Sequence, residues 1–426
     1  MMHSLLLRSL ILITTLFLSA NAYSQKYSEK SSTKKIVYFG SSVPKGEGAT
    51  NKFGYTSIFS EILQKRISPN KTQWETTNIS IGGDNTLKVL KRYEKDLLPQ
   101  NGQYVVFALA LGNEGIHEQG KVIFDQFEKN MKILIEKARA DGYIPVVTNS
   151  YTRNDYNNRD YDFIKRINLL IHTWDVPSIN LLGAIDDLSG HWMDGYWADG
   201  AHPNDAGHLE MAYTIVPSLF DALEKNKPLP ERVKGSHLVF KNKNKKTKSL
   251  RFTPEHIVHP FTTAITFKTG GIGQVLQFAA TDKKNNEGKG IIAIHNEGQL
   301  VYTSPKSDTV VGIKVNDNQW HTLVLTHYYA KGITMVYIDG ILQGTINEKL
   351  TARDLQIGGS NIPKKIAYKD WLFYRSAMNK DEINHIAEGP LLKSSLELYA
   401  PLGGKHRSKA SPFVNLAQSL NTISEL

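Results

Sequence analysis

The chain has 426 residues, of which 40% are hydrophobic and 22% charged, a composition typical of a soluble globular protein with two or more cores. It contains no cysteine, which excludes disulfides, a thiol nucleophile and thiolate metal sites. The formal net charge is +10, and much of the excess lies in a lysine-rich run over residues 241–248. We interpret this run as a solvated loop or, alternatively, as a site for an acidic polysaccharide. Nucleic acid is disfavoured as a partner because no aromatic-basic binding motif accompanies the charge.

Residues 1–22 have the pattern of a cleaved secretory signal peptide. Arg8 precedes an apolar run from Leu10 to Leu18, and Ala20-Asn21-Ala22 matches the small-x-small pattern of a cleavage site. The run is too short to span a bilayer. We therefore expect an exported protein, secreted or periplasmic, without membrane insertion.

Residues 35–225 alternate between apolar strand-like runs and amphipathic helical stretches. The strand candidates are residues 36–39, 105–109 and 144–147, and helical spacing of apolar residues separates them. Such alternation favours an α/β domain with a parallel sheet covered by helices on both faces. Sites in these sheets lie at the carboxyl ends of the strands, so Ser42, Asn113 and Ser150, each just after a strand, are expected to converge there.

A different pattern begins after residues 225–235, which contain Pro228 and Pro230 and read as a linker. Short strands with period-two alternation and hairpin turn signals at residues 296–298 and 339–340 predict an all-β sandwich over residues 236–403. A short helix near 381–387 and a strand at 396–400 complete it, and the residues after Gly404 are expected to form a loosely tied tail.

The motif that carries chemistry is Asp199-Gly-Ala-His202. A carboxylate three residues ahead of a histidine can hold the imidazole in one tautomer and orientation, which is what the general base of a serine hydrolase needs. A candidate nucleophile, Ser42, follows the first strand in Gly40-Ser41-Ser42.

Two loops could supply donors for the oxyanion of a tetrahedral intermediate. Gly82-Gly83 would let a backbone N–H approach the substrate closely, and Asn113 places a side-chain amide just after the second buried strand.

These four segments, in this order and spacing, resemble the SGNH (GDSL-type) hydrolase family over roughly residues 35–225. The resemblance implies a flavodoxin-like α/β/α fold and hydrolysis of esters, often acetyl groups on carbohydrates, or lipids. It also implies Ser42, Asp199 and His202 as the catalytic residues. The implied oxyanion donors are the backbone N–H groups of Ser42 and Gly83 and the side-chain amide of Asn113.

Three positions depart from the family pattern: Ser41 and Glu114 replace its Asp residues, and Leu111 replaces a Gly. None of them attacks or transfers a proton, so the chemistry should survive while substrate preference transfers less safely. Trp192, Tyr196 and Trp197 precede Asp199 and fit either a sugar-binding wall or the core, whereas His208 is expected to pack on the last helix.

Residues 236–403 resemble a concanavalin-A-like, laminin-G type jelly roll. The motifs that carry this resemblance are residues 249–252, 318–324, 334–340 and 370–375. The family's fold implies either carbohydrate binding, sometimes with calcium, or a structural role beside the neighbouring domain. No calcium ligand set can be named from the sequence.

We expect an exported esterase that removes acyl groups, most simply acetyl, from poly- or oligosaccharides through an acyl-enzyme intermediate. His202 takes the proton from Ser42 and later activates water, and no metal or other cofactor is required. Two alternatives stay open: a lipase or lysophospholipase, and a non-catalytic glycan-binding protein, which Ser41 and Leu111 favour.

Overall fold

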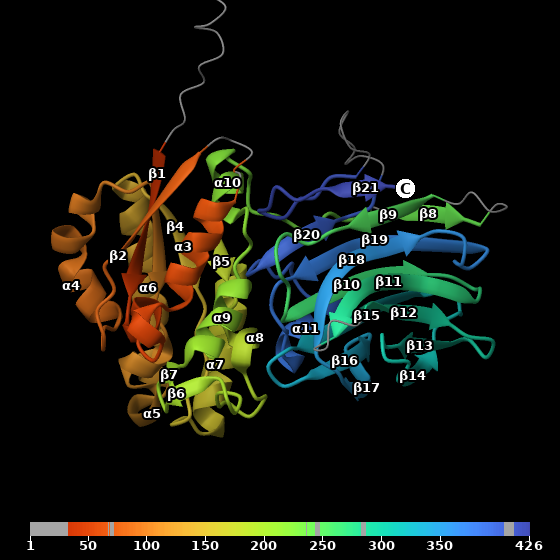
Figure 1. Ribbon diagram of the computed structural model, residues 1–426, viewed down its shortest axis with the longest axis horizontal. Helices are drawn as coiled ribbons and strands as arrows, with labels where there is room; N and C mark the ends of the chain where they lie inside the picture. Colours follow the sequence, from red (N-terminus) through yellow and green to blue (C-terminus); the bar gives the residue numbers. More distant parts are fainter. Residues whose placement is uncertain are drawn as a thin grey trace, which may run out of the picture.

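The computed structural model describes residues 33–66, 68, 72–235, 237–242, 248–282, 287–403 and 413–426. The predicted signal peptide and most of the lysine-rich run lie outside these residues. Figure 1 shows two domains side by side, an α/β domain followed by a β-sandwich. Over the described ranges, no helix combines the length and apolar character needed to cross a membrane.

The first domain is built on a five-stranded parallel sheet in the order β2-β1-β3-β4-β5. The strands are β1 (Thr33–Gly40), β2 (Gln73–Asn78), β3 (Tyr104–Ala108), β4 (Ile144–Thr148) and β5 (Ser178–Ile179). All five residues of β3 are buried, which is why its sequence is a continuous apolar run rather than an alternating one.

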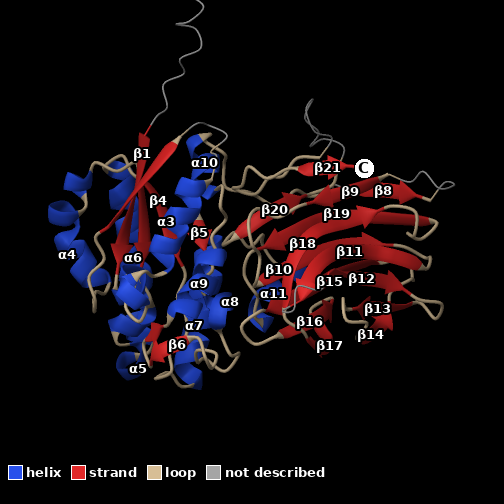
Figure 2. Ribbon diagram, viewed as in Figure 1, coloured by secondary structure: helices blue, strands red, loops and turns tan. Residues whose placement is uncertain are grey.

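Helices cover both faces of this sheet (Figure 2). One apolar cluster joins the sheet to α4 (Thr86–Asp96), α6 (Lys121–Ala140) and α7 (Asn158–Thr173), and another joins it to α3 (Tyr55–Lys65), α9 (Asp205–Tyr213) and α10 (Leu219–Glu224). Each helix buries one stripe, as Phe127, Met131 and Leu134 do on α6.

Short elements complete the domain around its sheet. They are α2 (Ser42–Lys45), the 3-10 turns η1 (Thr50–Lys52), η2 (Leu98–Gln100) and η3 (Leu111–Glu114), α5 (Ile116–Gln119), α8 (Leu182–Ile185), and the two-stranded ribbon of β6 (Trp197–Asp199) and β7 (His202–Pro203). Three of them, α2, η3 and the ribbon, carry Ser42, Asn113, Asp199 and His202, and Gly83 lies in the loop between β2 and α4.

The second domain is a sandwich of two seven-stranded antiparallel sheets. The first sheet contains β17 (Ile341–Asn347), β16 (Ile333–Ile338), β15 (Trp320–Tyr328), β10 (Phe261–Lys268), β19 (Lys365–Tyr374) and β20 (Leu396–Ala400), with β8 (Leu238–Lys241) also paired to β19. The second contains β14 (Thr309–Lys314), β13 (Gln299–Thr303), β12 (Glu287–Ile294), β11 (Gly273–Asp282), β18 (Leu350–Gly358), β9 (Ser249–Phe252) and β21 (Ile423–Glu425).

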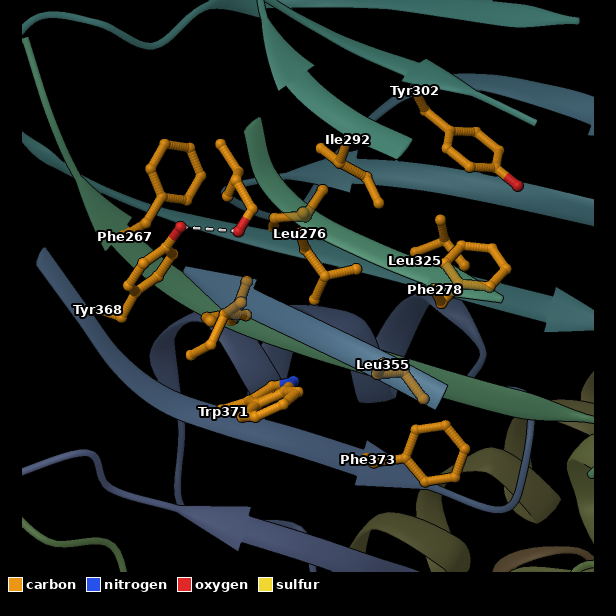
Figure 3. Packing of buried hydrophobic residues seen from close by; sticks show 14 of the residues in the cluster. Phe267, Leu276, Phe278, Ile292, Tyr302, Leu325, Leu355, Tyr368, Trp371 and Phe373 are labelled. Atoms are coloured by element: carbon orange, nitrogen blue, oxygen red, sulfur yellow. Dashed lines mark hydrogen bonds between the residues drawn. The ribbon is translucent and has the colours of Figure 1, made fainter. Parts of the chain in front are cut away.

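Large apolar side chains from both sheets fill the sandwich. Figure 3 shows Phe278, Leu325, Trp371 and Phe373 within this core, and all four are essentially inaccessible to solvent. The predicted fold class is therefore confirmed, since a parallel α/β domain precedes an antiparallel β-sandwich.

The helix α11 (Lys380–Glu388) covers part of the outer face of the first sheet, at the end nearest the α/β domain (Figure 1). Its Ile383 and Ile386 pack on Val324 and Leu372 of that sheet. Asn379 caps it in a reciprocal capping box with Glu382.

The predicted loose tail is wrong for residues 413–426. Strand β21 pairs antiparallel with β9 and extends the second sheet. Asn415 fixes the position of the segment before β21. Its side-chain amide donates to Glu397 O at 2.8 Å, and its Oδ1 accepts from Tyr399 N at 3.0 Å. The segment is therefore held by strand pairing and by buried hydrogen bonds.

Candidate active site

A cavity of about 440 Å³ opens beside the carboxyl ends of β1, β3 and β4. Its walls bring together all five predicted site residues, namely Ser42, Gly83, Asn113, Asp199 and His202. They come from four separate segments: the start of α2, the loop before α4, η3, and the β6–β7 ribbon. The first three follow β1, β2 and β3, whose carboxyl ends share one edge of the sheet.

Ser42 is the first residue of α2, directly after β1. The turn between them requires Gly40, because a Cβ there would lie 2.1 Å from Ala108 O of the neighbouring strand. The N–H groups at the start of a helix have no intrahelical partner. Ser42 can therefore offer both a hydroxyl and a backbone donor.

Asp199 and His202 face each other across the β6–β7 ribbon. His202 Nδ1 lies 2.9 Å from both carboxylate oxygens, and the Ala201 N–H donates to Asp199 Oδ1 at 2.8 Å. Partial burial acts to raise the pKa of Asp199, but these hydrogen bonds outweigh it and lower that pKa below its ordinary value. With the proton on Nδ1, His202 Nε2 is the acceptor.

The helix that carries Ser42 packs against the strand that carries His202. Gly48, in the segment after α2, has φ +90° and leaves no room for a side chain, because a Cβ would lie 2.2 Å from Pro203 O and 2.9 Å from His202 Cβ. The two parts of the chain therefore meet in close contact, although 160 positions separate Ser42 from His202.

The two remaining predicted residues lie beside Ser42. A Cβ on Gly82 would be 3.8 Å from Ser42 Cβ, and Gly83 adopts φ +75°. Asn113, in η3, donates through Nδ2 to Asp84 O at 3.0 Å, which ties it to the glycine loop. Its second amide hydrogen can still donate.

Sequence reasoning missed two residues of this cavity, Tyr151 and Arg153. Arg153 donates to Asp155 at 2.6 and 3.0 Å and reaches Asn113 Oδ1 at 3.4 Å, so it holds the orientation of that amide. Both residues follow β4, Tyr151 one position and Arg153 three positions after Ser150, so they also lie where strand ends place a site.

The departures from the family pattern are accommodated locally. Leu111 is fully buried in the core behind η3, and Glu114 accepts from Thr86 N at 2.5 Å and Thr86 Oγ1 at 3.0 Å at the start of α4. Of the three departures, Ser41, Leu111 and Glu114, only Ser41 lines the cavity. Burial raises the pKa of Tyr151 to about 12, and a hydrogen bond with Ser41 acts against that rise.

Ser150 lies outside the cavity wall, because its Oγ accepts from the Leu111 N–H at 3.2 Å. His208 is buried and structural, as expected. Its Nδ1 accepts from the Tyr55 N–H at 3.2 Å and its Nε2 lies 3.0 Å from Glu47 O. Burial lowers the pKa of His208 to about 4, so it is neutral near pH 7.

None of the three aromatic residues before Asp199 lines the cavity. Trp192 is buried and stacks on Tyr151 with ring centroids 5.6 Å apart. Trp197 is 40% exposed. The Tyr196 hydroxyl accepts from Lys349 Nζ of the sandwich at 2.7 Å, so the second domain supports the loop that leads to Asp199.

Part of the chain is similar to known proteins. Residues 38–209 match the GDSL-like Lipase/Acylhydrolase family. Over 193 residues the chain is 22% identical to Esterase TesA of Pseudomonas aeruginosa, covering 45% of this chain and 90% of that protein.

Solved structures resemble each domain at low identity. A catalytic mutant of Axe2, an acetylxylan esterase from Geobacillus stearothermophilus, aligns with a TM-score of 0.36 and 16% identity over 43% of this chain and 93% of its own. A SAP-like pentraxin from Limulus polyphemus aligns with a TM-score of 0.31 and 13% identity over 45% of this chain and 94% of its own.

Proposed function

We propose that residues 38–209, which match the GDSL-like Lipase/Acylhydrolase family, form an esterase domain that removes short acyl groups, above all acetyl, from carbohydrate. The proposal includes Ser42, His202 and Asp199 as the catalytic residues and residues 1–22 as an export signal. Its substrate is an acylated oligo- or polysaccharide outside the cell membrane.

The composition of the cavity wall carries this proposal. Its apolar side chains are those of Ala110, Tyr151 and Ala201, and the other lining residues are glycines or polar. A long acyl chain would need an extended apolar surface to leave water, at about 0.8 kcal/mol per buried CH₂. An acetyl group needs little such surface, and hydroxyl-rich sugars suit the polar wall.

The proposed reaction begins when Ser42 Oγ attacks the ester carbonyl while His202 Nε2 takes its proton. The Ser42 and Gly83 N–H groups and the Asn113 amide donate to the oxyanion, each donor being worth about 10²–10³ in kcat. His202 then gives this proton to the sugar oxygen as its bond to the acyl carbon breaks, so the sugar leaves with a free hydroxyl. Water, deprotonated by the same imidazole, releases the acid from Ser42.

The test is acetate release from a panel of acetylated oligosaccharides by the full chain. Ser42→Ala should abolish turnover while the circular dichroism spectrum stays unchanged. Ser57→Ala, the same substitution on α3 outside the cavity, is the matched control and should keep the wild-type rate. Equal turnover by Ser42→Ala and wild type would remove Ser42 from the mechanism.

The alternatives give different results in the same experiment. A lipase would cleave long-chain nitrophenyl esters faster than the acetate, and this preference would overturn the sugar-ester proposal. A folded protein that binds glycans but hydrolyses no ester would identify a non-catalytic scaffold instead.

A further inference from the structure

The outer face of the first sheet of the sandwich is covered only in part. Val324 of β15 lies beneath α11, whereas Trp320, four residues earlier on the same strand and face, is partly exposed. Beyond α11, this face carries a groove of about 840 Å³. We call it the basic groove.

Strand register places its key side chains in neighbouring rows. Val239 of β8 is opposite Ala367 of β19, Ala367 is opposite Lys268 of β10, and Lys268 is opposite Trp320 of β15. Val239 and Ala367 have small side chains and form a shallow floor. Lys268 and the indole ring of Trp320 border this floor on one side. Because side chains two positions apart share a face, Lys241 and Lys365, paired in the next row, border the same floor.

The groove carries positive charge that the protein does not neutralise. Lys241, Lys268, Lys364 and Lys365 line it, and no carboxylate does. Among the described residues, none of these four lysines has a carboxylate oxygen within ion-pair distance, in contrast to helical lysines such as Lys121, which pairs with Asp125 at 2.6 Å. Uncompensated charge in a concave site attracts anions.

Trp320 adds an apolar surface at the edge of this charge. Lys369 Nζ lies 4.6 Å from the centroid of its ring, and the His237 ring meets it edge-on at 5.8 Å. Trp320 also borders a second hollow, where the carboxylates are already paired: Asp370 with Arg232 at 3.0 Å and Asp339 with His321 at 2.8 Å.

We infer that the basic groove binds an acidic polysaccharide, a chain of sugars bearing carboxylate or sulfate groups. The CH face of a sugar ring packs on Trp320, and its anionic groups lie among the lysines. The volume is at the upper end of the range for small-ligand sites, about 300–1,000 Å³, which suits several sugar units. Single-stranded nucleic acid fits less well, since its sites stack successive bases on several aromatic rings and this groove has one tryptophan.

Binding can be measured on the full-length Ser42→Ala variant, so that its outcome does not depend on the proposed hydrolysis. The probes are oligogalacturonate for carboxylate, oligosaccharides of chondroitin sulfate for sulfate, neutral xylo-oligosaccharide, and oligo-dT, each followed by titration calorimetry. We expect an acidic glycan to bind and the neutral one to bind much more weakly. Affinity should fall between about 0.1 M and about 1 M salt, because the Debye length shortens from about 10 Å to about 3 Å.

The variants separate the groove from general surface charge. Lys268→Glu with Lys365→Glu should weaken binding of the acidic glycan by about tenfold or more, whereas Lys289→Glu, an exposed lysine on the other sheet, should leave it unchanged. Trp320→Ala should weaken binding of the glycans. Absence of binding by both acidic glycans, equal loss in Lys289→Glu, or tighter binding of oligo-dT would each overturn the inference.

Discussion

Asp199 should contribute less to kcat than a buried triad carboxylate does. The substitution Asp199→Asn measures this contribution. In the folded protein both carboxylate oxygens lie 2.9 Å from His202 Nδ1. Asparagine can keep one of these contacts and the hydrogen bond from the Ala201 N–H, but its NH₂ group then faces the Nδ1 proton. The substitution therefore removes the charge that stabilises the imidazolium and disfavours the tautomer in which Nε2 is the base.

The exposure of Asp199 sets the size of the effect. Two unit charges 4 Å apart interact by about 1 kcal/mol in water and about 4 kcal/mol at an effective dielectric constant of 20. Because the Asp199 side chain is 58% exposed, we expect about 1–3 kcal/mol, or roughly 5- to 150-fold in kcat. A buried carboxylate in the same role is worth about 10⁴.

The assay is kcat on nitrophenyl acetate near neutral pH, with Asp194→Asn, an exposed carboxylate of the same loop, as the matched control. Added salt should reduce the difference between wild type and Asp199→Asn, since exposed charges are screened. A loss of less than about twofold would refute the pairing of Asp199 with the imidazolium. A loss near 10⁴ would refute the use of solvent exposure to set its magnitude.

Two further predictions concern the loop before Asp199. Lys349→Ala should lower kcat by about 2- to 10-fold, the equivalent of one hydrogen bond. Tyr196→Phe should lower kcat by the same factor, and the double variant should show no further loss. Additive losses would show that the two side chains act separately. Asp186 is buried, accepts from the Tyr161 hydroxyl at 2.6 Å, and has its pKa raised by burial to about 7. A carboxyl whose folded pKa is raised stabilises the fold below its unfolded pKa of about 3.9, and this stability is lost as pH rises through the folded pKa. In urea unfolding, the free energy of unfolding of wild type should fall by up to about 4 kcal/mol relative to that of Asp186→Asn between pH 4 and pH 7. If the two proteins gave parallel profiles of stability against pH, Asp186 would not be protonated in its buried site.

The features that could be predicted from the sequence are those with a local signature. The α/β order follows from apolar runs such as β3, whose residues are apolar because helices cover both faces of the sheet. The candidate site follows from the same order, because Ser42 and Asn113 lie in the segments that follow β1 and β3. Arg153 follows β4 in the same way, but the sequence does not indicate its contact with Asn113, which lies 40 positions away.

Long-range polar contacts account for what the sequence did not predict. His172 of α7 is fully buried, yet both its ring nitrogens find partners in the sandwich: Nε2 lies 3.0 Å from Glu382 Oε1, and Nδ1 accepts from Ser394 N at 3.0 Å. His172 is more than 200 positions away from both Glu382 and Ser394. Neither local composition nor periodicity therefore marks this histidine as an interface residue.

The interface and the basic groove divide one sheet face between them, so a structural role and a binding role for the sandwich are compatible. Arg375, at the end of the domain interface, is 1% exposed and donates to Tyr213 O of α9 at 2.8 Å and to Glu397 at 2.9 Å. A buried ion pair tolerates little movement, because losing one partner costs about 3–5 kcal/mol. The α11 end of the sheet is thereby fixed to the α/β domain, and the distance from the groove to the cavity is fixed with it. A polysaccharide held beside Trp320 would thus meet Ser42 only through sugar units further along the same chain, which favours polymeric over monomeric substrates.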